Sequence, residues 1–224
     1  MTTVVIPVYN EVTQLDFTAP HQFLSMAPDV KVIVASVGGA PISSQGLFFD
    51  KLADLASIEA CDVICVPGGL GCITAMEDEQ FLSAVKRLAR TAKYVTSVCS
   101  GSLILGAAGL LNGRRAACHW AWRDMLTAFG AIPDSSRVVR DGDVITGGGV
   151  TAGVDFALTL ISELRGPDVA QCVQLGLEYA PAPPFNAGRP DAAPAHIRDA
   201  VTAQMESLLG DGRERVKALA SQMP

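Results

Sequence analysis

At 224 residues, the chain has the length of one domain with a modest extension, and 49% hydrophobic residues allow a large core. The net charge of −6 and the pI near 5.0 argue against a nucleic-acid-binding surface, which needs a concentrated basic face. No apolar run reaches membrane-spanning length, and the N-terminal segment lacks the features of a signal peptide. We therefore expect a cytoplasmic protein that binds neither nucleic acid nor membrane, and whose six cysteines are free thiols.

Strand-like and helix-like patterns alternate along the chain. Short β-branched or apolar runs predict strands at residues 3–9, 30–37, 62–66, 94–98, 138–139 and 144–145. Longer segments with apolar residues at helical spacing predict helices at residues 14–26, 75–92, 101–108, 119–128, 151–164 and 167–177. This alternation is typical of βαβ units, and we expect an α/β three-layer sandwich with a mostly parallel, flavodoxin-like sheet.

Residues 179–224 differ in composition from the rest of the chain. The segment YAPAPPFNAGRPDAAPAH is rich in Pro and Ala and is predicted to be extended, and residues 195–221 then follow an amphipathic helical pattern. We expect a single α/β domain over residues 1–224 that ends in this extended segment and helix. The segment either embraces a second subunit or packs on its own domain, and the pattern alone leaves both open.

Three glycine-containing turns follow predicted strands: VPGGLG at 66–71, VCSG at 98–101 and TGGGVTAG at 146–153. Because the carboxyl ends of parallel strands lie at one edge of a sheet, we expect these turns to meet there. The backbone N–H groups of Gly69, Leu70 and Val150 are candidate donors to negative charge on a bound substrate. None of these turns matches a phosphate-binding loop.

Cys99 lies between the strand-like run 94–98 and a helix whose start is marked by the hydroxyls of Ser100 and Ser102. A strand–turn–helix arrangement of this kind exposes the nucleophile of many α/β enzymes. The N-terminal end of a helix lowers a thiol pKa, so we expect Cys99 to be an outward-facing thiolate. A structural role is expected for the remaining five cysteines: Cys61, Cys65, Cys72, Cys118 and Cys172. The three histidines are scattered, and no metal site is expected.

Asp16 is the best candidate for an acid–base partner of the cysteine. It lies just after the first predicted strand, among Leu15, Phe17 and Ala19. A carboxyl group in apolar surroundings has a raised pKa, so it can hold a proton and return it. A helix-capping aspartate is the alternative interpretation, and the pattern alone supports both equally.

Several motifs together resemble the isocyanide hydratase family, which belongs to the superfamily of the PfpI-type proteases and shares the class I glutamine-amidotransferase-like fold. The motifs are LDFTAPHQF, DVICVPGG, YVTSVCSGSLILGAAGLL, ACHWAW, ITGGGVTAGVDFALTL and LEYAPAPPFNAG. The resemblance extends from about residue 3 to residue 190. PfpI-like proteases carry histidine directly after the cysteine, whereas this chain has Ser100 there.

The resemblance implies hydration of an organic isocyanide to an N-substituted formamide, by a homodimer without metal or organic cofactor. Cys99 would attack the terminal isocyanide carbon to give a thioimidate, and Asp16 would act as general acid and base. Ser100 would serve as the hydroxyl residue beside the nucleophile, a position that is often threonine in the family. The resemblance also implies a pocket with few charges, in keeping with the scarcity of Lys and Arg around Cys99 in the sequence.

Two other functions share this fold. Glyoxalase-like relatives act on α-oxoaldehydes with the same nucleophile, but rely on a glutamate near the first strand where this chain has Asp16. Regulators of the AraC type join such a domain to a DNA-binding helix-turn-helix pair of about a hundred residues, whereas about 35 residues follow Gly188 here, and the acidic balance disfavours DNA.

Overall fold

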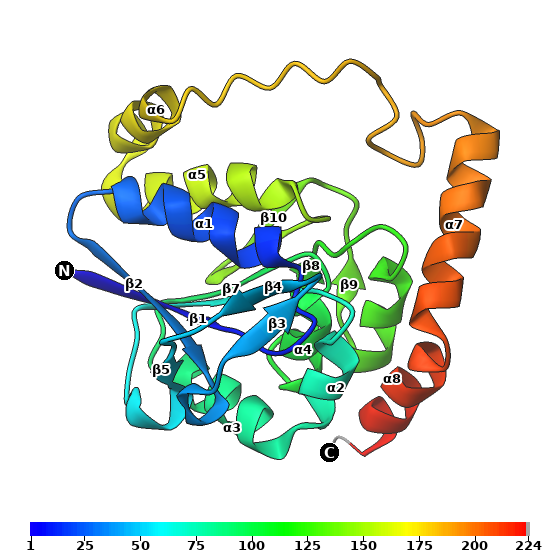
Figure 1. The fold of residues 1–224 in the computed structure, drawn as a ribbon, viewed down its shortest axis with the longest axis horizontal. Helices are drawn as coiled ribbons and strands as arrows, with labels where there is room; N and C mark the ends of the chain where they lie inside the picture. The colour runs from blue at the N-terminus through cyan, green and yellow to red at the C-terminus, as the bar shows by residue number, and fades with distance from the viewer. Residues whose placement is uncertain (223–224) are drawn as a thin grey trace.

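A seven-stranded sheet forms the centre of the structure, a computed structural model that describes residues 1–222 (Figure 1). Its strands are β1 (Thr2–Pro7), β2 (Val30–Ser36), β5 (Ala53–Asp54), β6 (Val63–Val66), β7 (Tyr94–Val98), β10 (Val138–Asp141) and β11 (Val144–Gly147). They lie in the order β10-β11-β7-β6-β1-β2-β5, and every neighbouring pair is parallel except β10 and β11. The five long parallel strands therefore have the flavodoxin-like order, and the predicted mostly parallel sheet is confirmed.

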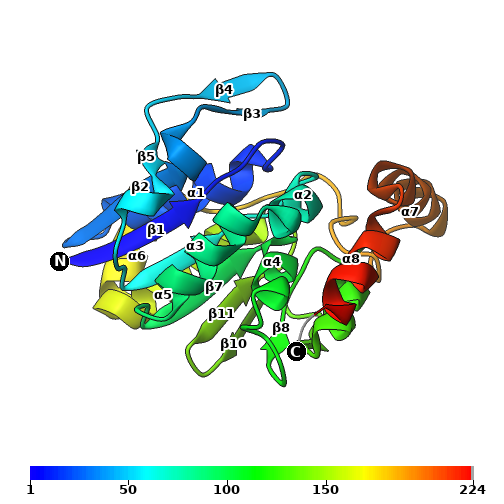
Figure 2. The same cartoon turned by 90° about the horizontal axis from the view of Figure 1, so that it is seen from below.

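Helices cover both faces of the sheet (Figures 1 and 2). One face carries α1 (Gln14–Met26), α5 (Ala152–Arg165) and α6 (Pro167–Gly176), and the other carries α2 (Cys72–Glu77), α3 (Glu79–Ala89) and α4 (Gly101–Ala107). Strands buried on both faces are mostly apolar, and every residue of β6 and β7 is buried, including the small polar residues Thr96 and Ser97. Gly153 of α5 lies against Pro20 of α1: a Cβ on Gly153 would be in ordinary van der Waals contact with that ring, at 3.4 Å.

The predicted helix over residues 75–92 is two helices in the structure. Asp78 separates α2 from α3 because its carboxylate accepts hydrogen bonds from the N–H groups of Gln80 and Phe81, which caps α3. The helix predicted for residues 119–128 begins later than expected. Residues 119–122 form a non-helical turn, and a 3₁₀ helix, η3 (Arg123–Phe129), follows.

Short elements that the sequence patterns did not predict complete the fold. They are the hairpin β3 (Ile42–Ser44) and β4 (Leu47–Phe49), the pair β8 (Arg115–Ala116) and β9 (Ile132–Pro133), and two 3₁₀ turns, η1 (Val37–Gly39) and η2 (Leu55–Ser57). Their runs of two or three residues are too short to produce a recognisable period. The β3–β4 hairpin projects away from the main sheet (Figure 2).

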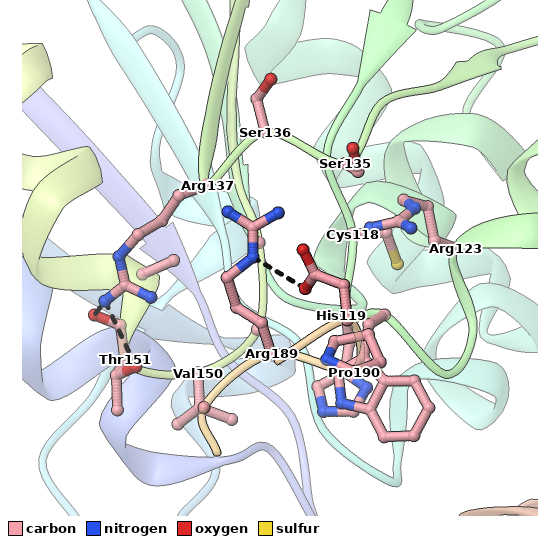
Figure 3. A pocket seen from close by; sticks show the side chains of 16 residues that line it. Cys118, His119, Arg123, Ser135, Ser136, Arg137, Val150, Thr151, Arg189 and Pro190 are labelled. Atoms are coloured by element: carbon pink, nitrogen blue, oxygen red, sulfur yellow. Dashed lines mark hydrogen bonds and ion pairs between the residues drawn. The ribbon is translucent and has the colours of Figure 1, made fainter. Parts of the chain in front are cut away.

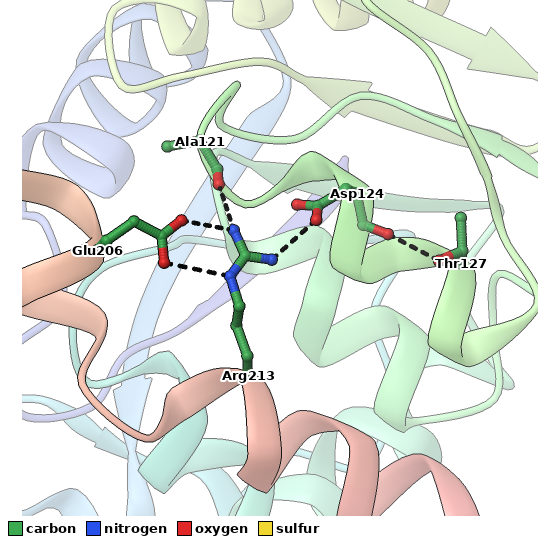
Figure 4. Close-up of polar contacts among 5 residues, drawn as sticks. All are labelled: Ala121, Asp124, Thr127, Glu206 and Arg213. Carbon is green, nitrogen blue, oxygen red and sulfur yellow. Dashed lines mark hydrogen bonds and ion pairs between the residues drawn. The ribbon is translucent and has the colours of Figure 1, made fainter. Parts of the chain in front are cut away.

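The segment after α6 is extended, as predicted, and arches to the far side of the molecule (Figure 1). The single helix predicted for residues 195–221 is interrupted at Gly210, whose φ is 56°, and forms α7 (Ala195–Leu209) and α8 (Gly212–Ser221). Arg213 at the start of α8 ties these elements together: its guanidinium contacts Asp124 and Glu206, each at 2.8 Å, and the carbonyl oxygen of Ala121 (Figure 4).

The two terminal helices differ in how much they bury. In α8, Val216 is 1% exposed and anchors the helix to the domain. In α7, the last residue, Leu209, is the only buried one. Phe185, in the extended segment, is 80% exposed. No helix within residues 1–222 has both the length and the apolar character needed to cross a bilayer.

Candidate functional site

The candidate site lies where the winding of the sheet reverses. The chain passes from β1 to β2 on one side and returns to β6 on the other side of β1, which creates a crevice at the carboxyl ends of β1 and β6. Asp16 on α1, the Gly68–Gly69 turn after β6, and Cys99 after β7 meet at this edge of the sheet. The predicted convergence of the turns is confirmed.

Cys99 occupies a strained turn between β7 and α4. Its φ is 58°, in the left-handed region that residues other than glycine rarely adopt. The Cys99 N–H donates to the carbonyl oxygens of Gly147, at 3.1 Å, and Gly148, at 2.8 Å, which ties the turn to the end of β11. A Cβ on Gly101 would lie 2.1 Å from the carbonyl oxygen of Val66, so the tight turn requires glycine there. This is the geometry of a nucleophile elbow.

The expectation that Cys99 faces outward as a thiolate is wrong in this structure. Cys99 is 4% exposed, because the surrounding turns close over the sulfur. Burial raises the pKa of the thiol well above its usual value, and the neighbouring carboxyl group of Asp16 raises it further. The backbone amides of Val150 and Ser100 lie near the sulfur and act in the opposite direction, lowering the pKa. The helix end therefore supplies donors, but burial outweighs them in the resting site.

Asp16 is fully buried on the first turn of α1. Burial raises its pKa from the usual 3.8 to about 7. The N–H of Gly68 donates to Oδ2 at 3.0 Å and has the opposite, smaller effect of lowering the pKa. The nearby Cys99 thiol also lowers the pKa of Asp16. Oδ1 nevertheless has no hydrogen-bond partner within residues 1–222, so the contact with the thiol is not a fully formed bond. Asp16 is not the helix cap: Thr13 holds the N-cap position of α1.

The amides of the Gly68–Gly69 turn hold the site together. Gly68 donates to Asp16, and the Gly69 N–H donates to the Ser100 hydroxyl at 3.0 Å. The Gly69 amide was expected to donate to a substrate, but in the structure it already donates to the Ser100 hydroxyl. The amide of Leu70, which is an exposed residue, has no acceptor in the part of the chain that the structure describes. The Ser100 and Ser102 hydroxyls do not cap α4 as expected: Ser102 donates to the carbonyl oxygens of Cys99 and Ala117.

Gly68 is also required for steric reasons. A Cβ at this position would lie 2.5 Å from the Ser100 nitrogen, 2.6 Å from its Oγ and 2.9 Å from Oδ2 of Asp16. Those distances are shorter than any relaxed contact, so a side chain on Gly68 would displace the groups that surround the nucleophile.

Tyr9 belongs to the same region and was missed in the sequence. Its hydroxyl donates to the carbonyl oxygen of Pro67 at 2.9 Å, directly before the glycine turn. Burial raises the pKa of Tyr9, and the neighbouring groups Cys72, Asp16 and Cys99 raise it further. The position of Tyr9 two residues after β1 was the available signal, because the same strand end leads to Asp16.

A protein-family comparison identifies this arrangement. The model of the DJ-1/PfpI family matches residues 2–163, which include both Asp16 and Cys99. The chain belongs to the DJ-1/PfpI family. The resemblance of the sequence motifs to the PfpI superfamily is thus confirmed.

Three relatives show how the similarity is distributed. The isonitrile hydratase of Pseudomonas putida is 54% identical over 192 residues, which are 85% of this chain and 84% of the relative. The crystal structure of a THiJ/PfpI family protein from Pseudomonas syringae has a TM-score of 0.91 at 42% identity, and the match covers 98% of this chain and 90% of the other. The glutathione-independent glyoxalase DJR-1.2 of Caenorhabditis elegans is 30% identical over 107 residues, covering 48% of this chain and 57% of the relative.

Within this DJ-1/PfpI protein, the cysteines other than Cys99 differ in exposure. Cys61, Cys65, Cys72 and Cys118 are buried, and burial raises the pKa of each thiol to about 11 or 12. Cys172 on α6 is exposed, which contradicts the expectation that it is a core residue. Among residues 1–222, no three side chains of His, Cys, Asp or Glu are grouped so that they could hold a metal ion.

A cavity of about 440 Å³ adjoins the elbow of this DJ-1/PfpI protein (Figure 3). Its wall includes Val150, whose amide contacts the Cys99 sulfur, and three arginines: Arg123, Arg137 and Arg189. The wall of this cavity therefore carries positive charge, whereas no arginine is among the groups that shift the pKa of Cys99. The three arginines come from η3, the segment before β10, and the extended C-terminal segment, so nothing in the local sequence around Cys99 signals them.

Proposed function

We propose that this protein hydrates organic isocyanides to N-substituted formamides. The observation that carries the proposal is the 54% identity with an isonitrile hydratase over most of both chains, in a protein that has a cysteine elbow beside a buried carboxyl group. The overall reaction is R–N≡C + H₂O → R–NH–CHO. It requires a nucleophile for the terminal carbon and a group that both gives and takes protons.

Cys99 and Asp16 supply these two functions in the proposed mechanism. As the sulfur attacks the terminal carbon, Asp16 accepts the thiol proton and passes it to that carbon, which gives the thioimidate Cys99–S–CH=N–R. A carboxyl group with a pKa of about 7 suits this exchange, because it is ionised in part of the population at neutral pH and still acidic enough to return the proton. The buried thiol does not need to be a thiolate beforehand, since the base lies next to it.

Water completes the reaction at the same carbon. Asp16 draws a proton from the attacking water as its oxygen bonds to the thioimidate carbon, and the nitrogen gains a proton. The resulting tetrahedral adduct, R–NH–CH(OH)–S–Cys99, then collapses: the C–S bond breaks, the hydroxyl proton leaves, and the sulfur regains a proton. The products are the formamide and the original thiol, so the scheme uses no metal or organic cofactor.

Backbone amides stabilise the charges that develop in this scheme. The amides of Val150 and Ser100 lie near the sulfur and lower its pKa, and the amide of Leu70 is available for the substrate nitrogen or the oxygen of the adduct. Ser100 positions the nucleophile turn through its bond with Gly69.

The proposal includes a homodimer. Phe185 and most of α7 are exposed, although the helix carries the apolar residues Ile197 and Leu208, which are 43% and 49% exposed. A segment that buries so little against its own chain has a reason to bury its apolar side chains against a second copy.

Product analysis with a simple aryl isocyanide tests the proposed function. Wild-type protein is expected to convert phenyl isocyanide to N-phenylformamide, and Cys99→Ala to lose this conversion. A parallel incubation with methylglyoxal tests the glyoxalase alternative. Lactate formation without formamide formation would reject isocyanide hydration in favour of that alternative.

A further inference from the structure

We propose that the cavity beside the elbow binds the organic substituent of the isocyanide, and that this substituent carries a carboxylate. The inference rests on the proposed function and specifies its substrate class. The cavity is bounded by η3, the segment before β10, the first turn of α5 and the extended C-terminal segment (Figure 3).

The cavity borders the nucleophile turn, although Cys99 and Asp16 do not themselves line it. Val150 and Cys118 line it, and the amide of Val150 is also close enough to the Cys99 sulfur to lower its pKa. Gly148, another lining residue, accepts the N–H of Cys99 at 2.8 Å. In the proposed arrangement, the terminal carbon of the isocyanide lies at the sulfur and its substituent extends past Val150 into this space.

The charge of the cavity wall is positive and partly uncompensated. Arg123 forms no ion pair or hydrogen bond within residues 1–222, and Asp134, whose pKa it helps to lower, accepts the N–H of Ser136 and lies 3.8 Å from Arg115. Arg123 therefore has a guanidinium with all its donors available. An uncompensated guanidinium in a concave site favours a planar anion that can accept two hydrogen bonds.

The other charged residues add to this field. Arg137 bonds to Asp155 outside the cavity and to Thr151, and Figure 3 shows the contact with Thr151. Arg189 bonds to Asp191 at 3.1 Å. The residues that line the cavity include three arginines but one carboxylate, that of Asp191. Burial lowers the pKa of His119, so its ring is neutral and adds no charge. The amino end of α5, whose N-cap is Thr151, also faces the cavity and favours an anion.

The size of the cavity also favours a substituted ligand. An apolar cavity of about 150 Å³ accommodates benzene. The volume here is about 440 Å³, so an unsubstituted alkyl or aryl isocyanide leaves most of it empty. A carboxylate on the far side of an aromatic or branched substituent fills the remaining space and meets the arginines.

The test compares two matched substrates, 4-isocyanobenzoate and its methyl ester, in the wild type and three variants. We expect kcat/KM to be about tenfold higher for the anion than for the ester, the gain of one charge-assisted hydrogen-bonding contact. Arg123→Gln should remove most of this preference, and Arg189→Gln, on the exposed segment, should reduce it. Arg140→Gln is the matched control: Arg140 pairs with Glu163 away from the cavity, and its loss should leave the preference unchanged.

A second measurement follows binding without turnover. The product 4-formamidobenzoate should bind more tightly than its methyl ester in calorimetry, and Arg123→Gln should abolish the difference. Equal use of the two isocyanides, or a preference that Arg123→Gln and Arg189→Gln leave intact, would overturn the inference while the proposed function stands. If no isocyanide is hydrated, the proposed function fails, and the binding difference still decides whether the cavity selects a carboxylate.

Discussion

Replacing Asp16 with asparagine should stabilise the protein at neutral and alkaline pH. The carboxyl group of Asp16 is fully buried, and its pKa in the folded state is raised from 3.8 to about 7. Asparagine has nearly the same shape and still accepts the hydrogen bond of the Gly68 N–H, but it carries no charge. The substitution therefore removes the free-energy penalty of a buried ionised carboxylate.

The sign and the size of the effect follow from the difference between the two pKa values. Below pH 3.8 the carboxyl group is protonated in both the folded and the unfolded chain, and there is no penalty. Between pH 3.8 and 7 the unfolded chain ionises while the folded site retains its proton, so stability falls by about 1.4 kcal/mol per pH unit. Over about three pH units this amounts to an upper limit of about 4 kcal/mol, which persists above pH 7.

The asparagine side chain has a cost of its own. Its NH₂ group takes the place of Oδ1, which has no partner within residues 1–222, and an unsatisfied buried donor costs about 1–3 kcal/mol. The variant should accordingly be less stable than the wild type at pH 4 and more stable by roughly 1–3 kcal/mol at pH 8.

Urea unfolding followed by tryptophan fluorescence at pH 4, 6 and 8 measures this difference. Asp134→Asn is the control with the opposite sign: hydrogen bonds from Ser136 lower the pKa of Asp134, so that carboxylate stabilises the fold above its unfolded pKa and loses the effect as the pH falls. A stability difference between wild type and Asp16→Asn that stays constant from pH 4 to 8 would refute a raised pKa at Asp16.

Three further outcomes are expected. Gly68→Ala should lower kcat/KM about 100-fold, since its Cβ would clash with Ser100 and shift the site by about 1 Å, whereas Gly176→Ala, with open space around it, should have no effect on kinetics. The rate of hydration should rise with pH through an apparent pKa near 7 that belongs to the coupled Asp16–Cys99 pair, and a pH-independent rate from pH 5 to 9 would exclude Asp16 as the base. Light scattering should give twice the monomer mass at micromolar concentration, and a monomer would count against the dimer.

The elbow was predictable because its signals are local. A buried strand, a cysteine and a helical pattern follow one another within residues 94–108, and the glycine turns mark the ends of neighbouring strands. The order of strands and helices then places these ends at one edge of the sheet by the general rules of parallel winding. Asp16 was found for the same reason, since it follows β1.

The protonation state of Cys99 was not predictable from those local signals. The helix end beside it suggested a thiolate, but burial within the folded structure raises the thiol pKa. The role of the Gly68 and Gly69 amides was hidden in the same way, because their acceptors, Asp16 and Ser100, are 52 and 31 residues away.

The arginine-lined cavity shows the limit of sequence patterns most clearly. Arg123, Arg137 and Arg189 are spread over 67 residue positions and belong to a short helix, a loop and an extended segment, none of which has a period that fixes its direction. Only the tertiary structure brings them together beside Val150. Cys172 is a further example: its helix was predicted, but the pattern did not show which side of α6 faces solvent.

The most direct test of the account is a search for the covalent intermediate on Cys99. Wild-type protein is mixed with excess aryl isocyanide, quenched within the first turnover, digested and analysed by mass spectrometry. We expect the peptide that contains Cys99 to gain the full mass of the isocyanide, because the thiol adds across the terminal carbon without loss of atoms. Cys99→Ala should show no adduct and form no formamide. An adduct on Cys72, Cys118 or Cys172 instead, or formamide production by Cys99→Ala at the wild-type rate, would contradict the account.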